Sequence, residues 1–166
     1  MAEFEHMELA IDGKIARMNL NRPEALNAMP HSMVVEMDAI AERLQFDQEI
    51  RLVVLTGAGR AFSSGIDLKA LAAGKIGEPY LDLWERFLRR LETMDKIVLC
   101  LLHGYFIGGG LQLALACDIR VTTASAKTGL PAVREGIIPS LGPWRLARHV
   151  GLGRAKQLTL LGNLID

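Results

Sequence analysis

The chain has 166 residues, of which 50% are hydrophobic and 23% are charged, a balance typical of a globular domain with a real core. Its 19 lysines and arginines are matched by 19 aspartates and glutamates, which leaves no basic surplus for binding nucleic acid. Because the two cysteines, Cys100 and Cys117, lie in apolar segments without metal-ligand spacing, we expect reduced, buried thiols in a cytoplasmic protein. The sequence predicts neither a secretory signal nor a membrane span.

Local patterns predict a hairpin followed by alternating helices and strands. Asp12 and Gly13 form a dipeptide typical of hairpin turns. Helices are predicted where apolar residues recur at spacings of three and four, and Asp67 is placed to cap a helix that starts at Leu68. In chain order, the expected elements are strands 4–11 and 14–20, helix 30–46, strand 51–56, the helix starting at Leu68, helix 80–94, strand 97–102, helix 111–116, strand 118–123, and helices 143–150 and 154–161. The alternation from residue 30 onward indicates a parallel sheet with crossover helices.

Two glycine-containing loops carry the clearest functional signal. One includes Gly108, Gly109 and Gly110 and lies between the strand 97–102 and the next helix. The other, residues 57–65, also joins a buried strand to a helix start. Backbone N–H groups at a helix N-terminus are unpaired and can hold an anion or a polarised carbonyl oxygen. The alternative is that the glycines only let a helix pack closely on the sheet.

If the two strands are neighbours, N–H groups from both loops converge on one point. Two backbone donors aimed at one carbonyl oxygen form an oxyanion hole. Neither loop matches the Walker phosphate pattern or the dinucleotide fingerprint, so nucleotide binding by those routes is not expected.

Four segments resemble, in order, those of the crotonase (enoyl-CoA hydratase/isomerase) superfamily. Residues 21–29 (NRPEALNAM) resemble its first acyl-CoA-binding loop, and residues 61–69 (AFSSGIDLK) its first oxyanion loop. Residues 103–110 (HGYFIGGG) resemble the second oxyanion loop. Residues 131–146 (PAVREGIIPSLGPWRL) resemble the segment that carries a catalytic acid.

The resemblance implies one crotonase-like domain over residues 1–166: an α/β superhelix of strand–strand–helix turns with two roughly perpendicular sheets. It implies an acyl-CoA thioester ligand whose carbonyl is held by the amides of Ile66 and Gly109. Coenzyme A belongs to the substrate, and neither a separate cofactor nor a metal is expected. By the same resemblance, the expected substrate-binding residues are Arg22, Ala25, Ala28, Ser64, Gly65, Asp67, Leu68, Lys69, Gly108, Pro131 and Ala132. For Arg22 and Lys69, a solvated surface charge is the alternative.

The sequence departs from the family pattern at both glutamates that its hydratases use. The first position, two residues after the glycine triplet, holds Gln112, and the second, directly after Pro131, holds Ala132. Glutamine can orient water but cannot exchange a proton near neutral pH, and alanine can do neither. If residues 132–135 form a helical turn, Glu135 shares a face with Ala132 and is the candidate acid or base. The alternative is a surface Glu135, paired with its neighbour Arg134.

Two functional hypotheses follow from intact oxyanion loops and replaced glutamates. The first is an enzyme, a lyase or isomerase of fatty-acid metabolism, that stabilises a thioester enolate and favours isomerase-like or other non-hydratase chemistry. The second is a non-catalytic acyl-CoA-binding homologue. Family members continue into a C-terminal helical region that builds trimers, and this sequence is expected to lack most of it. We therefore expect a homo-oligomer, trimer-based by resemblance.

Overall fold

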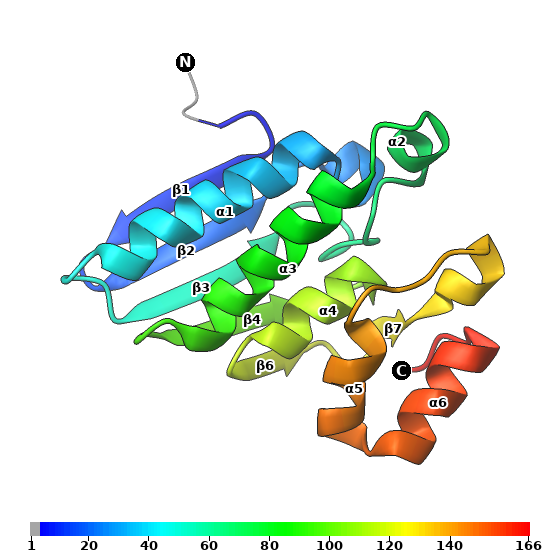
Figure 1. Cartoon of the computed structure of the whole chain (residues 1–166). Helices are drawn as coiled ribbons and strands as arrows, with labels where there is room; N and C mark the ends of the chain where they lie inside the picture. The colour runs from blue at the N-terminus through cyan, green and yellow to red at the C-terminus, as the bar shows by residue number, and fades with distance from the viewer. Residues whose placement is uncertain (1–3) are drawn as a thin grey trace.

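The computed structural model describes residues 4–166 and contains two sheets (Figure 1). The larger sheet has the strand order β1-β2-β3-β4-β6, and the smaller pairs β5 with β7. The strands are β1 (Met7–Asp12), β2 (Ile15–Leu20), β3 (Leu52–Gly57), β4 (Ile97–Leu102), β5 (Tyr105–Ile107), β6 (Ile119–Thr122) and β7 (Lys127–Gly129). The helices are α1 (His31–Phe46), α2 (Leu68–Ala72), α3 (Glu78–Thr93), α4 (Gly109–Ala116), α5 (Gly142–Val150) and α6 (Leu152–Leu161), with short 3-10 helices η1 (Pro23–Ala25) and η2 (Pro131–Glu135).

The larger sheet begins with the predicted hairpin and continues as parallel strands. β1 and β2 pair antiparallel, with Asp12 opposite Ile15 across the turn at Gly13. β2, β3, β4 and β6 then run parallel, each joined to the next by a segment that includes a helix. Because parallel neighbours require such crossovers, the alternation predicted from residue 30 onward is confirmed. The parallel order also brings the carboxyl ends of β3 and β4 to one edge, where both glycine-containing loops begin.

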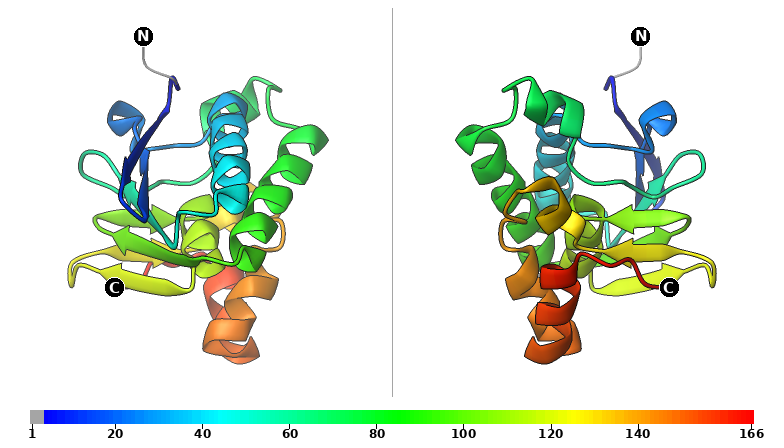
Figure 2. Two further views of the ribbon diagram at one scale, coloured as in Figure 1. Left: turned by 90° about the vertical axis from the view of Figure 1, so that its left-hand side faces the viewer. Right: turned by 90° about the vertical axis from the view of Figure 1, so that its right-hand side faces the viewer.

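Helices α1 and α3 cover one face of the large sheet and bury the main core against it (Figures 1 and 2). Their apolar stripes include Met37, Ile40, Phe87 and Leu88, all 0% exposed. The sequence periodicity predicted both helices, because core-facing positions on a helix recur every three or four residues. Helices α5 and α6 lie beyond β6, near the C-terminus of the chain (Figure 1). No helix among residues 4–166 is long and apolar enough to cross a membrane.

The second sheet corrects the expectation of an uninterrupted loop after β4. Tyr105–Ile107 forms β5 and pairs in parallel with Lys127–Gly129, which forms β7. Strands of three residues carry no periodic signal, so the sequence pattern alone missed both. Helix α4 also begins earlier than predicted, because Gly109 and Gly110 belong to its first turn rather than to the loop. The two-sheet architecture implied by the family resemblance is confirmed.

Candidate active site

The two glycine-containing loops meet at Gly65 and Gly109. A Cβ built on Gly65 would lie 2.7 Å from the carbonyl oxygen of Ile107 and 2.9 Å from the amide nitrogen of Gly109. A Cβ built on Gly109 would lie 3.6 Å from the amide nitrogen of Ile66. Gly65 also adopts φ +94°, which side chains rarely tolerate. Glycine at position 65 is therefore what allows the amides of residues 66 and 109 to approach each other.

The backbone of Ile66 is oriented by pairing with Met29. The Met29 amide donates to the Gly65 carbonyl at 2.8 Å, and the Asp67 amide donates to the Met29 carbonyl at 3.2 Å. In extended backbone, successive N–H groups point to opposite sides, so the N–H of Ile66 points away from Met29.

Gly109 is the first residue of α4. The first N–H groups of a helix have no intrahelical partner and lie at the positive end of the helix dipole. Gly108, just before α4, adopts φ +56° and ψ −113°, and its amide donates to the Gly129 carbonyl at 2.9 Å. This hydrogen bond ties the start of α4 to β7, and the Gly109 nitrogen lies close to Gly65.

Asn27 connects two loops through buried hydrogen bonds. The sequence analysis assigned this residue no role. Its side chain is 0% exposed, and its amide nitrogen donates to the carbonyls of Ala58, Ala61 and Phe62 at 2.9–3.1 Å. Its carbonyl oxygen accepts from the Arg22 amide at 2.8 Å. A buried asparagine that satisfies this many main-chain groups holds the loop of residues 21–29 onto that of residues 57–65. In the sequence, this role is indicated only by the presence of an asparagine within the turn segment of residues 21–29.

We expect Asn27→Ala to lower the free energy of unfolding by about 2–4 kcal/mol, because it leaves buried carbonyls without donors. The measurement is urea-induced unfolding of the variant and the wild type. Asn19→Ala is a suitable control, because the Asn19 side chain bonds only to exposed or half-buried partners, Glu8 and Thr56. A loss for Asn27→Ala no larger than that of the control would contradict the bracing role.

A mostly apolar cavity of about 130 Å³ opens beside the two amides. It brings together nine of the predicted site residues from three segments of the chain. Those that line it are Ser64, Ile66, Leu68, Gly108, Gly109, Gln112, Pro131, Ala132 and Glu135. Tyr80, Trp84 and Ser140 also line the cavity, and the sequence analysis had not assigned Tyr80 or Ser140 to it.

The groups that could exchange protons in the cavity are few. Residues 131–135 form η2, whose three-residue repeat places Ala132 and Glu135 on the same face, toward the cavity. Glu135 is the one carboxylate among the described residues that line it. The Glu135 side chain is exposed, as the surface alternative predicted, but the guanidinium of Arg134 donates to Asn163 at 2.6 Å rather than pairing with Glu135.

Tyr80 and Gln112 are two further polar residues that line the cavity. The Tyr80 hydroxyl donates to the Met29 carbonyl at 3.2 Å. Burial, reinforced by the negative charge of Asp67, raises the pKa of Tyr80 well above its ordinary value, so it stays neutral. Gln112 is 5% exposed, and its Oε1 accepts from Trp84 Nε1 at 3.4 Å.

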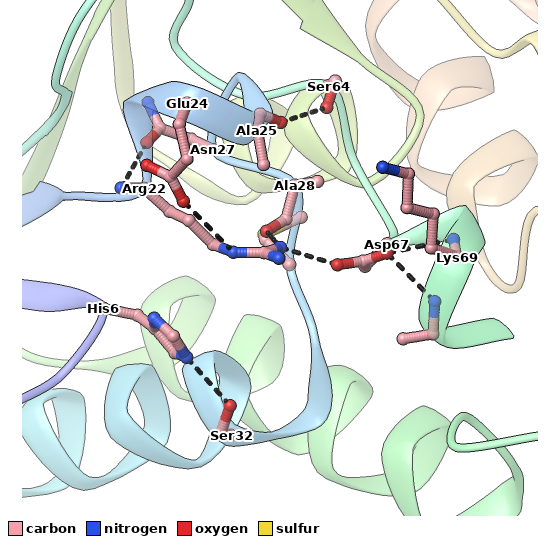
Figure 3. Close-up of polar contacts among 12 residues, drawn as sticks. His6, Arg22, Glu24, Ala25, Asn27, Ala28, Ser32, Ser64, Asp67 and Lys69 are labelled. Carbon is pink, nitrogen blue, oxygen red and sulfur yellow. Dashed lines mark hydrogen bonds and ion pairs between the residues drawn. The ribbon is translucent and has the colours of Figure 1, made fainter. Parts of the chain in front are cut away.

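A second, polar cleft contains Arg22, Asp67 and Lys69, close to the oxyanion loops. Figure 3 shows Arg22 reaching across to Asp67 at the start of α2, with a 2.6 Å ion pair, while it also donates to the Ala28 carbonyl at 3.0 Å. Burial alone would raise the pKa of Asp67, but hydrogen bonds from the Ala70 amide and Arg22 hold it below its usual value. Asp67 caps α2 as predicted, by accepting from the amides of Lys69 and Ala70.

These contacts give Arg22 a structural role within the loop, so the alternative of a merely solvated charge does not hold for it. Ala25 and Ala28 belong to the same loop and take part through their carbonyls, which accept from Ser64 and Arg22. Contact of these residues with coenzyme A stays a prediction. His103 bonds through Nε2 to the Gly59 carbonyl at 3.0 Å, which ties the end of β4 to the loop of residues 57–65. Among residues 4–166, no three histidine, cysteine or acidic side chains are grouped to hold a metal ion.

An α/β fold in which two glycine-containing loops meet beside an apolar cavity is an arrangement that can hold a polarised carbonyl group. Residues 10–166 match the family model described as enoyl-CoA hydratase/isomerase. A short-chain-enoyl-CoA hydratase of Clostridium acetobutylicum is 38% identical over 160 residues, which cover 94% of this chain and 61% of the relative. A crotonyl-CoA hydratase of Syntrophomonas wolfei is 34% identical over 98% of this chain and 64% of its own length.

The comparison with solved structures also finds enoyl-CoA hydratases. An enoyl-CoA hydratase from Bacillus anthracis superposes with a TM-score of 0.90 at 30% identity, over 97% of this chain and 64% of that one. The chain belongs to the enoyl-CoA hydratase/isomerase (crotonase) family. It spans less than two thirds of the length of the relatives named above.

Proposed function

We propose that the protein acts on a short-chain acyl-CoA thioester and stabilises its enolate with the amides of Ile66 and Gly109. The observation that carries this proposal is the close approach of the backbones of Gly65, Ile66 and Gly109 beside the apolar cavity. A thioester carbonyl gains negative charge on its oxygen when the α-carbon loses a proton, and preorganised N–H donors stabilise that charge. The small volume of the cavity and the similarity to a short-chain-enoyl-CoA hydratase support a short acyl group.

The proposed chemistry is isomerase-like rather than hydration. Hydration through two glutamates needs an acid at each of two positions, which here hold Gln112 and Ala132. Moving a double bond along an acyl chain needs one group that takes a proton from one carbon and returns it to another. Glu135, at the cavity face of η2, is the proposed carrier.

Glu135→Gln tests this assignment. We expect a loss of about 100-fold or more in kcat/KM for conversion of a 3-enoyl-CoA to the 2-enoyl isomer, because the amide cannot carry a proton. The matched control is Glu78→Gln, which neutralises an exposed carboxylate at the start of α3 that does not line the cavity. Unchanged isomerisation by Glu135→Gln would remove Glu135 from the mechanism.

A non-catalytic acyl-CoA-binding protein is the second candidate, favoured by the loss of both hydratase glutamates. Calorimetric titration with butyryl-CoA, together with assays on short 2- and 3-enoyl-CoAs, separates the two candidates. Binding without turnover supports the second candidate, and absence of binding at millimolar ligand contradicts both.

We also propose that the protein is a cytoplasmic homo-oligomer, trimer-based by family resemblance. The exposed apolar side chains of Trp144, Leu152 and Leu160 on α5 and α6 support self-association.

A further inference from the structure

Met29 contacts both glycine-containing loops, one through its backbone and the other through its side chain. Its backbone pairs in parallel with that of Ile66: the Met29 amide donates to the Gly65 carbonyl at 2.8 Å, and the Met29 carbonyl accepts from the Asp67 amide at 3.2 Å. The residue is 0% exposed, and its terminal methyl carbon, Cε, would lie 2.8 Å from a Cβ built on Gly109. A methyl group therefore fills the space where a side chain at position 109 would begin.

That methyl group lies at the place where the two loop backbones approach each other. The position of the Gly109 Cβ is also 3.4 Å from the Cα of Gly65 and 3.6 Å from the amide nitrogen of Ile66. Three atoms, from Met29, Gly65 and Ile66, thus surround one point beside Gly109. Because protein interiors are close-packed, a group that fills such a point limits how closely the two backbones can approach. The Met29 side chain has the position of a spacer.

Tyr80 fixes the Met29 carbonyl from the first turn of α3. Tyr80 is 3% exposed, and its hydroxyl donates to this carbonyl at 3.2 Å. With the Asp67 amide as the other donor, both lone pairs of the carbonyl oxygen are used. Burial raises the pKa of Tyr80, so the hydroxyl keeps its hydrogen, and that hydrogen is committed to Met29. Although Tyr80 lines the cavity, its hydroxyl has no hydrogen left to donate to a ligand.

We propose that Met29 sets the distance between the amides of Ile66 and Gly109, and that Tyr80 holds Met29 in place. Both are positioning residues, because each acts through the amides and not on the substrate. Oxyanion donors are effective only within about 2.7–3.1 Å of the developing charge, and a misplacement of about 1 Å can lower a rate by about 100-fold. The inference rests on the proposed function, because it requires that the two amides bind a thioester oxygen.

The first test compares Met29→Ala with Met33→Ala in the full chain. Both methionines are 0% exposed and belong to the same core, but Met33 lies on α1 and outside the two loops. The two changes remove the same atoms, so we expect similar shifts of the urea midpoint. For a short enoyl-CoA, we expect Met29→Ala to lower kcat about tenfold or more and to change KM less than about twofold, because misplaced donors weaken transition-state binding most. Met33→Ala is expected to keep kcat.

The second test uses Tyr80→Phe, which keeps the buried ring and removes only the hydroxyl. It decides the question even if Met29→Ala does not fold. The readout is the carbonyl stretching band of bound butyryl-CoA labelled with ¹³C at the thioester carbonyl, which requires no turnover. We expect the shift of this band to lower frequency to be smaller in Tyr80→Phe than in the wild type, at saturating ligand. Tyr105→Phe, which removes the hydroxyl of a tyrosine that is 42% exposed on β5, is the matched control and is expected to keep the full shift.

The outcomes separate this inference from the proposed function. If the wild type shows the band shift and both Met29→Ala and Tyr80→Phe keep it, the inference fails while the proposed function stands. An equal loss of kcat in Met33→Ala also overturns the inference, because general core packing would then explain the effect. A rise in KM for Tyr80→Phe with an unchanged band would mean that Tyr80 contacts the substrate itself, which contradicts its positioning role. If the wild type binds no butyryl-CoA, the proposed function fails as well.

Discussion

Gly65→Ala is expected to abolish most of the enolate chemistry, with a fall of at least about 100-fold in kcat/KM for an enoyl-CoA substrate. The added Cβ would lie 2.7 Å and 2.9 Å from backbone atoms of Ile107 and Gly109, which cannot yield as a flexible side chain could. The loops must separate, and the amides of Ile66 and Gly109 then no longer meet at one oxygen. The measurement is steady-state kinetics with a short enoyl-CoA, together with calorimetric binding of butyryl-CoA.

Gly13→Ala is the matched control for backbone strain. Gly13 also has a positive φ, +55°, but nothing lies within 4 Å of its added Cβ, and it belongs to the hairpin turn between β1 and β2. Both substitutions therefore incur the left-handed penalty of a non-glycine residue. Only Gly65→Ala changes the loop contact. Equal activity of Gly65→Ala and Gly13→Ala would contradict the assignment of the two amides.

The double variant Gln112→Glu with Ala132→Glu is expected to gain hydration of a short 2-enoyl-CoA, by about 100-fold or more over the wild type. Both positions line the cavity, and hydratases of this family use glutamates there. A general acid and a general base each contribute on the order of 100-fold or more to such proton transfers. A glutamate at position 112 can still accept from Trp84 Nε1, so the local packing tolerates it. Hydration is followed as the loss of the absorbance of the conjugated thioester.

The control for this gain of hydration is the double variant Gln112→Glu with Ala132→Gln. Glutamine at position 132 keeps the size and polarity of glutamate but has no carboxyl group. This control variant is expected to hydrate at close to the wild-type rate. If the wild type already hydrates as fast as the double glutamate variant, the replacement of the two glutamates does not limit the reaction. The isomerase-like proposal would then lose its chemical basis.

Much of the fold was predictable because its signals are local and repeated. The Asp12-Gly13 turn, the helical periodicity of α1 and α3, and the alternation of helices with β3, β4 and β6 each depend on short stretches of sequence. The second sheet was not predictable from such patterns, since β5 and β7 are three residues long and pair across 22 positions in sequence. The family resemblance supplied the two-sheet architecture instead.

The candidate site was predictable in its motifs but not in its contacts. The two glycine-containing loops and the capping role of Asp67 could be predicted from glycine placement and residue type. The partners of Asn27, Ser140 and Arg22 could not, because each bonds to groups more than 30 residues away in sequence. Such hydrogen bonds depend on how the crossover segments pack, so no local sequence pattern predicts them.

The most direct test of the oxyanion site is the infrared difference spectrum of butyryl-CoA bound to the protein, with ¹³C at the thioester carbonyl. Two hydrogen bonds from Ile66 and Gly109 polarise the C=O bond, so its stretching band is expected at a lower frequency than in free butyryl-CoA. The shift is expected to be lost in Gly65→Ala at concentrations that still saturate the site. A carbonyl band at the frequency of the free thioester in the saturated wild-type complex would contradict the central claim.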